Sequence, residues 1–204
     1  MKKTSIIWVV IGSIAVIALY VKFVKAPSVY DSAVAQQEEV VASWGNVEAT
    51  YQRRADLIPN LVSTVKGYAA HEKEVLLGVT QARSKVGQVN IDASNLNAQN
   101  IQKFQAAQSG LTQALSKLMV VMERYPDLKA NQNFLQLQAQ LEGTENRINV
   151  ARQRYNGAVK SYNTFIRGYW KKTFIGWIAE EGEFEKKGVF EADKGAEKAP
   201  SVQF

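Results

Sequence analysis

Residues 134–165 read FLQLQAQLEGTENRINVARQRYNGAVKSYNTF, which is the longest stretch of the chain with a helical period. Its large apolar residues recur at three- and four-residue spacings, which is the period of one face of an α-helix rather than the alternation of a strand. No proline interrupts the pattern. We therefore predict one long amphipathic helix, whose buried face carries Phe134, Leu137, Leu141, Ile148, Ala151, Tyr155, Val159, Tyr162 and Phe165.

Three earlier stretches, 30–53, 57–86 and 101–122, have the same helical period. Turn and capping residues fill 87–97, and Pro126 ends the third stretch. Asp56 and Pro59 predict a break between the first and second stretches, although a kink at 55–59 in one continuous helix fits the sequence as well. Short connections favour antiparallel neighbours, so we predict an all-α fold with an up-down-up-down four-helix bundle.

An apolar run precedes these stretches. Ile6–Tyr20 reads IIWVVIGSIAVIALY, and continuing to Val24 gives 19 positions with one lysine among them. That length suits a hydrocarbon core of about 30 Å at about 1.5 Å per residue. Trp8 and Tyr20 stand near the two ends, where aromatic rings favour the membrane interface. We predict a single-pass transmembrane helix that includes Ile6, Trp8, Tyr20 and Val24.

A cleaved signal peptide is the alternative, because Lys2 and Lys3 resemble its charged start. The small-residue tripeptide 33–35 lies about a dozen residues beyond the apolar run, which is too far for the usual cleavage site, so we favour a retained anchor. Two lysines stand on each side of the run, so the positive-inside comparison is a tie. We expect the bacterial inner membrane, with the bundle on the extracytoplasmic side.

The formal net charge of +6 does not indicate a nucleic-acid binder. The anchor is flanked by four lysines: Lys2, Lys3, Lys22 and Lys25. Without them the chain has 21 basic and 19 acidic residues. Nucleic-acid binding needs basic residues clustered on one face, and no such cluster stands out. We predict a lipid bilayer as partner and no nucleic acid.

The predicted domains are an anchor with a short tail (1–25), the bundle (26–168) and a C-terminal region (169–204). Gly168–Ile178 combines aromatic residues with two lysines, a composition typical of an interfacial segment. A cap over the end of the bundle core or a contact between subunits would explain it as well. We expect 179–204 to be a flexible or partner-ordered tail. The candidate membrane-interface residues are Trp170, Lys171, Lys172, Phe174 and Trp177.

The sequence offers little for catalysis. His71 is the only histidine, and His71-Glu72 resembles the start of a zinc-protease helix, but valine occupies the position of the second ligand. Cysteine is absent, so a tetrahedral zinc site cannot be assembled in the usual way. We predict no enzymatic activity, no metal, no cofactor and no small-molecule substrate.

Two helical stretches, 52–61 and 145–156, are dense in polar residues. In an antiparallel bundle their charges could pair across helices and set the register. They could instead form a contact surface for another protein, since arginine is enriched at interfaces. The candidate interaction residues are Arg53, Arg54, Asp56, Pro59, Asn60, Glu145, Arg147, Arg152, Arg154 and Tyr155.

The sequence resembles the LemA family in RRADLIPNLVSTVKGYAAHEKEVL (53–76), YPDLKANQNFLQLQAQLEGTENRI (125–148) and ARQRYNGAVKSYN (151–163). The ending, from Phe190 to Phe204, is also similar, whereas Gly168–Ile178 departs from the segment usual there. The resemblance implies one membrane helix, an antiparallel helical bundle and no enzymatic activity. It also implies relatives associated with envelope stress, with a membrane metalloprotease encoded nearby and with the shaping of magnetosome membranes.

From these features we expect a non-catalytic scaffold of the bacterial envelope that self-associates as a homo-oligomer and organises or shapes membrane. The alternative is an adaptor that regulates a membrane protease, or another envelope protein partner, in a one-to-one complex.

Overall fold

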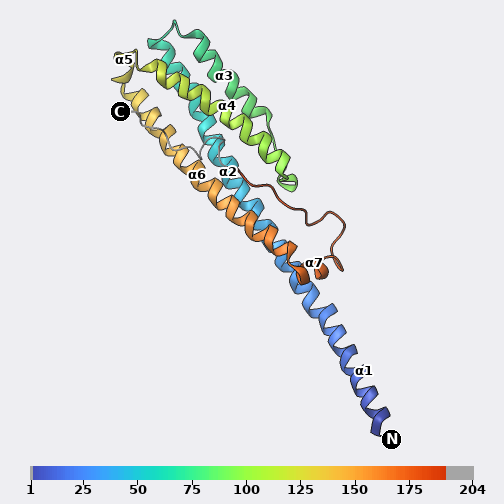
Figure 1. The fold of residues 1–204 in the computed structure, drawn as a ribbon. Coiled ribbons are helices and arrows are strands. Elements are labelled where there is room, and N and C mark those ends of the chain that lie inside the picture. Colours follow the sequence, from blue (N-terminus) through green and yellow to red (C-terminus); the bar gives the residue numbers. More distant parts are fainter. Residues whose placement is uncertain (1, 192–204) are drawn as a thin grey trace, which may run out of the picture. The chain divides into compact units, whose positions relative to one another are not determined.

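A computed structural model describes residues 2–191 of the chain (Figure 1). Helices make up 83% of this part and no strand occurs in it, which confirms the all-α class. The helices are α1 (Lys2–Tyr20), the π-helical η1 (Val21–Lys25), α2 (Ala26–Tyr68), α3 (Lys73–Gln88), the 3₁₀ turn η2 (Ala93–Asn95), α4 (Ala98–Met122), α5 (Pro126–Lys129), α6 (Gln132–Arg167) and α7 (Tyr169–Ile175).

The described residues divide into two compact units. We call residues 2–43 with 157–186 the N-terminal unit, and residues 44–156 with 187–191 the core unit. Both α2 and α6 contribute residues to each unit. The unit boundaries therefore fall inside helices, and the division into an anchor, a bundle and a C-terminal region stays a prediction.

The predicted anchor is helical, and its side chains are not buried against the rest of the described chain. Within the described residues, one helix is long and apolar enough to cross a membrane, and it runs from Ile6 to Tyr68 without interruption. The side chains of Ile6, Trp8, Tyr20 and Val24 are each at least half exposed. Apolar surface of this extent is costly in water, so the exposure supports burial in lipid.

Of the two alternatives at 55–59, the break at Asp56 and Pro59 is wrong and the continuous helix is confirmed, because α2 continues through both residues to Tyr68. The turn into α3 lies instead at residues 69–72. A proline inside a helix leaves the carbonyl four residues earlier without its usual donor, here the carbonyl of Ala55. The Arg83 Nε donates to the Ala55 oxygen at 2.9 Å and supplies the missing bond. This contact from α3 explains how the helix accommodates Pro59.

We expect the replacement Arg83→Met to lower the free energy of unfolding by about 1–2 kcal/mol, because the carbonyl of buried Ala55 loses its donor. In a Pro59→Ala background the same replacement should cost less than about 0.5 kcal/mol, since the amide of residue 59 then bonds to Ala55. Denaturant titration of the four variants measures both values. Equal losses in the two backgrounds would contradict this account of Pro59.

The core unit buries apolar side chains from five helices. Its core takes Ile58, Leu61 and Val65 from the end of α2, Ala69 from the turn after it, Leu76 and Val79 from α3, Leu111, Leu118 and Met122 from α4, Leu128 from α5, and Phe134 and Leu141 from α6. Helices α3 and α4 lie side by side (Figure 1). Most of the predicted apolar stripes are therefore buried. Tyr68 is an exception at 45% exposed, and its hydroxyl instead accepts a hydrogen bond from the Asn131 amide.

The N-terminal unit contains aromatic contacts of its own. The Tyr30 hydroxyl of α2 donates to Glu183, and its ring meets Phe184 edge to face. Tyr162 of α6 is fully buried, and its hydroxyl has no hydrogen-bond partner among the described residues. Burial, followed by the charges of Glu185 and Glu183, raises the pKa of Tyr162 to about 12. The folded chain therefore holds this proton more tightly than the unfolded chain does.

Stability should fall at alkaline pH. Below pH ~10 an unfolded tyrosine keeps its proton, so Tyr162 adds no pH dependence there. Between about 10 and 12 the unfolded chain loses the proton first, which costs up to about 1.4 kcal/mol of stability per pH unit. Tyr162→Phe should remove the contribution of Tyr162 to this loss of stability with pH. At pH 8 it should raise the free energy of unfolding by up to about 1 kcal/mol, because it removes a buried hydroxyl that has no hydrogen-bond partner within the described chain. Denaturation midpoints at several pH values test both expectations, and an unchanged alkaline slope in Tyr162→Phe would refute the assignment.

Candidate functional site

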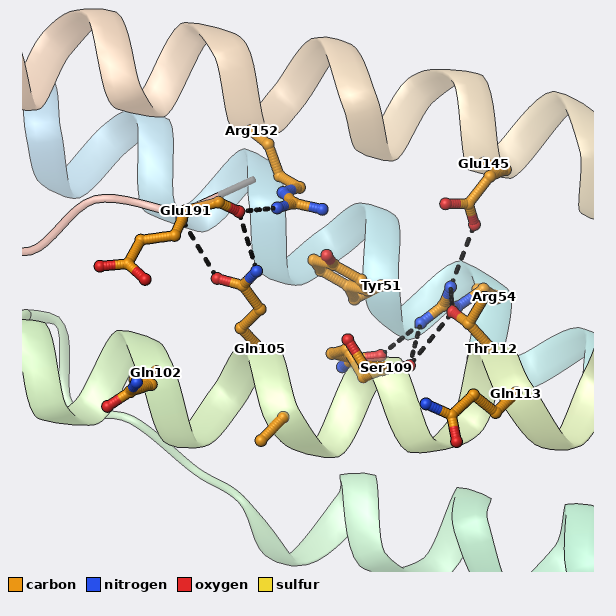
Figure 2. Close-up of a pocket in the computed structure, with 12 residues that line it drawn as sticks. Tyr51, Arg54, Gln102, Gln105, Ser109, Thr112, Gln113, Glu145, Arg152 and Glu191 are labelled. Atoms are coloured by element: carbon orange, nitrogen blue, oxygen red, sulfur yellow. Dashed lines mark hydrogen bonds and ion pairs between the residues drawn. The ribbon is translucent and has the colours of Figure 1, made fainter. Parts of the chain in front are cut away.

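A buried arginine lies at the centre of the core unit. Arg54 of α2 is 3% exposed, and its guanidinium group points toward α4 and α6 (Figure 2). Nη1 donates to Thr112 Oγ1 and to Glu145 Oε2, each at 3.0 Å. Nη2 donates to Gln108 Oε1 at 2.6 Å, and the group lies over the Tyr51 ring at 5.1 Å from its centre. One side chain thus connects three helices.

The charges of this cluster are unevenly exposed. Glu145 is 46% exposed, whereas Arg54 is almost fully buried. Removing a charge from water is costly and is repaid only when a counter-charge and hydrogen bonds replace the lost water. Because Glu145 keeps contact with water, it can be rehydrated if the pair breaks, whereas Arg54 cannot. The arrangement supports the prediction that charges pair across helices.

A polar groove of 580 Å³ adjoins Arg54. Amide, hydroxyl and guanidinium groups dominate its lining, which includes Gln102, Gln105, Ser109, Gln113 and Arg152 (Figure 2). Such groups bind polar ligands or peptide backbone by hydrogen bonds. Glu191, from near the end of the described chain, also lines the groove.

Residues 187–191, which we call the strap, pack into the core unit in extended form. Phe190 is 5% exposed and lies among three aromatic side chains. Its ring stacks on Trp44 at 6.2 Å between centres and meets Tyr155 at 5.4 Å and Phe104 at 6.3 Å. The guanidinium of Arg152 lies 5.0 Å from the centre of the same ring. The strap therefore completes an aromatic cluster.

Side-chain amides hold the strap backbone as they would hold a bound peptide. Asn156 donates to the Phe190 carbonyl and accepts from the Phe190 amide, both at 2.9 Å. Gln105 likewise donates to the Glu191 carbonyl at 2.9 Å and accepts from the Glu191 amide at 3.2 Å. Arg152 donates to the same Glu191 carbonyl at 2.9 Å. The expectation of a flexible or partner-ordered tail over 179–204 is therefore wrong for residues 187–191, which side chains of the same chain hold in place, and 192–204 lie outside the described residues.

Gly188 brings the strap unusually close to the start of α4. Its amide donates to the Leu96 carbonyl at 2.7 Å, and its carbonyl accepts from the Tyr155 hydroxyl at 3.0 Å. A Cβ at this position would lie 2.6 Å from the Ala98 Cα, which is a backbone atom that cannot move aside. Burial raises the pKa of Tyr155 far above its ordinary value, so this hydroxyl remains a donor. The strap sequence therefore requires glycine here.

Four of the ten candidate interaction residues meet in this region. Arg54 and Glu145 form the buried cluster, whereas Arg152 and Tyr155 hold the strap. Pro59 acts through the Ala55 carbonyl on α2. The side chains of Arg53, Asp56, Asn60, Arg147 and Arg154 are exposed and lie outside the cluster.

Four further residues of the site were not predicted from the sequence: Gln105, Gln108, Thr112 and Asn156. A signal for Gln108 exists, because it lies four residues after Phe104 and three before Leu111, on the apolar stripe of α4. A polar residue at such a position needs a buried partner. No comparable signal marks Gln105 or Asn156, whose partner is backbone of the distant strap.

Comparisons with known proteins find a matching family and several relatives. Residues 43–204 match the LemA family. The chain is 24% identical over 158 residues to Protein LemA of Metamycoplasma hominis, covering 78% of this chain and 67% of that protein. It is 28% identical over 166 residues to Magnetosome protein MamQ 2 of Paramagnetospirillum magneticum, covering 73% of this chain and 61% of that protein.

A further relative is Magnetosome protein MamQ of Magnetospirillum gryphiswaldense, 27% identical over 154 residues, which cover 67% of this chain and 57% of that protein. The chain thus spans less than two thirds of the length of either MamQ protein.

Proposed function

Because the chain belongs to the LemA family, we propose that it is a non-catalytic, membrane-anchored helical scaffold of the bacterial envelope whose copies associate. The observation that carries this proposal is the unbroken helix from Ile6 to Tyr68, which begins in exposed apolar residues and ends in the buried core. A helix shared in this way ties the folded part directly to the bilayer. The inner membrane and its extracytoplasmic side remain our expectation for the location.

The scaffold we propose is an antiparallel up-down-up-down bundle of α2, α3, α4 and α6. The shared core of these four helices supports this arrangement. The short connections at 69–72 and 123–131 support it too, because helices joined by short loops are usually antiparallel neighbours.

The surface of α3 and α4 offers a place for a second copy. A groove of 520 Å³ there takes half of its lining from small residues, among them Gly78, Ala82, Ala107, Gly110 and Ala114. A Cβ at Gly78 or Gly110 would meet no atom of the chain within 4 Å, so internal packing does not require glycine at either position. Glycine inside a helix costs about 1 kcal/mol relative to alanine.

Charges on α3 suit a two-fold contact at this groove. Glu74 lies in the first turn of α3 and Lys85 in its last turn, and both line the groove. In a two-fold interface the same patch faces itself, so antiparallel α3 helices would pair Glu74 of each copy with Lys85 of the other. Small residues between these charges would let the helices approach closely.

Replacing Gly110 with leucine should dissociate the assembly. The added side chain points into the groove, while the fold has room for it. Gly143→Leu on α6 is the matched control, because Gly143 is exposed and also has open space at its Cβ. Mass photometry of the detergent-extracted full chain should show oligomers for wild type and Gly143→Leu, and mainly monomer for Gly110→Leu. A wild-type monomer at all concentrations would reject self-association.

The polar groove beside Arg54 favours a second candidate, a one-to-one adaptor or regulator of a membrane protease or other envelope protein. Its exposed amides and Arg152 could bind a partner segment. Crosslinking in native membranes distinguishes the candidates. The scaffold predicts crosslinks between copies of this chain, and the adaptor predicts one dominant different protein.

A further inference from the structure

Helix α7 and the turn after it expose a row of aromatic rings. Tyr169 is 79% exposed, Trp170 66% and Trp177 59%. Consecutive rings touch, with centres 5.1 Å apart for Tyr169 and Trp170, 6.4 Å for Trp170 and Phe174, and 5.4 Å for Phe174 and Trp177. Ile175, by contrast, is only 8% exposed. The exposed rings of Tyr169, Trp170 and Trp177 therefore do not cap the unit's own interior.

The row lies beside the end of the apolar helix. Trp177 and Ile178 line one hollow of 610 Å³ together with residues of α1, η1 and the start of α2, all within the N-terminal unit. The residues contributed by the helix are Ala18, Val21, Lys22, Phe23 and Ala26. The aromatic segment thus meets the helix where its apolar run gives way to lysines.

The length of the apolar run indicates that its C-terminal end, and the aromatic segment beside it, lie at a membrane surface. The 19 positions from Ile6 to Val24 span about 28 Å as a helix, close to the thickness of a hydrocarbon core. If these residues fill the core, residues 18–26 cover roughly the last 9 Å of hydrocarbon and the start of the headgroup layer. Trp177 and Ile178, which share a hollow with them, then lie at the same depth.

We propose that α7 and Trp177 insert into the interfacial layer of the bilayer that α1 crosses, as a second membrane contact. Tryptophan and tyrosine favour this layer because one part of each side chain is apolar and another is polar. The exposed Lys171 and Lys172 can extend toward the headgroups. This contact would restrict the tilt and rotation of α2 above the membrane. The inference rests on the proposed membrane anchoring.

The rings, rather than charge, should drive this contact. The basic residues of this region are Lys22, Lys25, Lys171, Lys172 and Lys186, and the segment after α7 contributes the acidic residues Glu180, Glu181, Glu183 and Glu185. Acidic and basic residues are therefore nearly balanced. We expect insertion into zwitterionic phosphatidylcholine bilayers without a requirement for anionic lipid.

Spin-label depth measurements test the proposal. The chain has no cysteine, so single-cysteine variants of the full-length protein carry one label each. Lys172→Cys reports on α7, Val16→Cys on the membrane span, and Gln136→Cys on an exposed position of α6. In phosphatidylcholine nanodiscs, relaxation by oxygen and by a water-soluble nickel complex should place label 16 in hydrocarbon, label 172 at the interface and label 136 in water.

Label 172 should move into water when Trp170→Ser and Trp177→Ser are added. A label at 172 that matches the aqueous label 136, while label 16 is deep, would overturn the α7 contact and leave the anchor intact. An aqueous label at 16 would reject the anchor itself. Spin–spin broadening at 172 that disappears on dilution with unlabelled chains would show that a second copy, rather than lipid, covers α7, and would also overturn the proposal.

Discussion

Replacing Phe190 with alanine should lower the free energy of unfolding by about 3 kcal/mol, the lower end of the range for a buried phenylalanine. The ring is 5% exposed and fills the space between Trp44, Phe104 and Tyr155. The strap can leave its site instead of leaving a cavity, which limits the loss. For a chain of this size, the midpoint of thermal unfolding should fall by about 6–12 °C, measured by circular dichroism.

The strap itself should detach in this variant. The amides of Gly188 and Phe190, which bond to Leu96 and Asn156, should exchange with deuterium much faster than in wild type. Val189→Ala is the matched control, because Val189 lies in the same strap but is 44% exposed. It should cost less than about 0.5 kcal/mol. If Phe190→Ala and Val189→Ala had equal midpoints, the strap would not be part of the core.

Removing Glu145 should destabilise the chain more than removing its buried partner. In Glu145→Ala, Arg54 stays almost fully buried without a counter-charge, which should cost about 3 kcal/mol. In Arg54→Met, Glu145 returns to water, and the main cost is the lost partner of buried Gln108, about 2 kcal/mol. The larger effect thus comes from the more exposed residue of the pair.

The double variant Arg54→Met with Glu145→Ala should be about as stable as Arg54→Met alone, because no charge is left buried and unpaired. Arg53→Met is the control, since Arg53 is exposed and adjacent on α2, and it should change stability by less than about 0.5 kcal/mol. Denaturant titration gives all four values. Strictly additive losses would show that Arg54 and Glu145 do not act as a pair.

Both polar stretches of the sequence, 52–61 and 145–156, supply part of the site. Arg54 and Glu145 come from different stretches and meet in the core unit, which supports the interpretation that charges pair across helices. Neighbouring candidates such as Arg53 and Arg147 point to solvent. The apolar period continues through this turn, since Arg54 lies three residues after Tyr51 and four before Ile58, whereas Arg53 lies off the stripe. The predicted break at 55–59 hid this difference, because it ended the stripe at Tyr51.

The sequence alone predicts the helical class and the apolar helix. Both follow from the local period and composition of the chain, which do not depend on distant contacts. The end of α2 and the position of the strap depend on tertiary contacts. Helix α2 continues through Pro59 because Arg83, far along the chain, donates a hydrogen bond to the Ala55 carbonyl. It ends near residue 69, in a turn where the Glu72 carboxylate accepts hydrogen bonds from Arg124 and Tyr125.

The same reason applies to the strap. One phenylalanine among charged residues gives no helical or strand period, so nothing local predicts that it is buried. Its position depends on an aromatic cluster and on amide groups that three helices bring together. The residues that bind the strap lie on these helices and not in the strap itself, so its position can be read only from the folded structure.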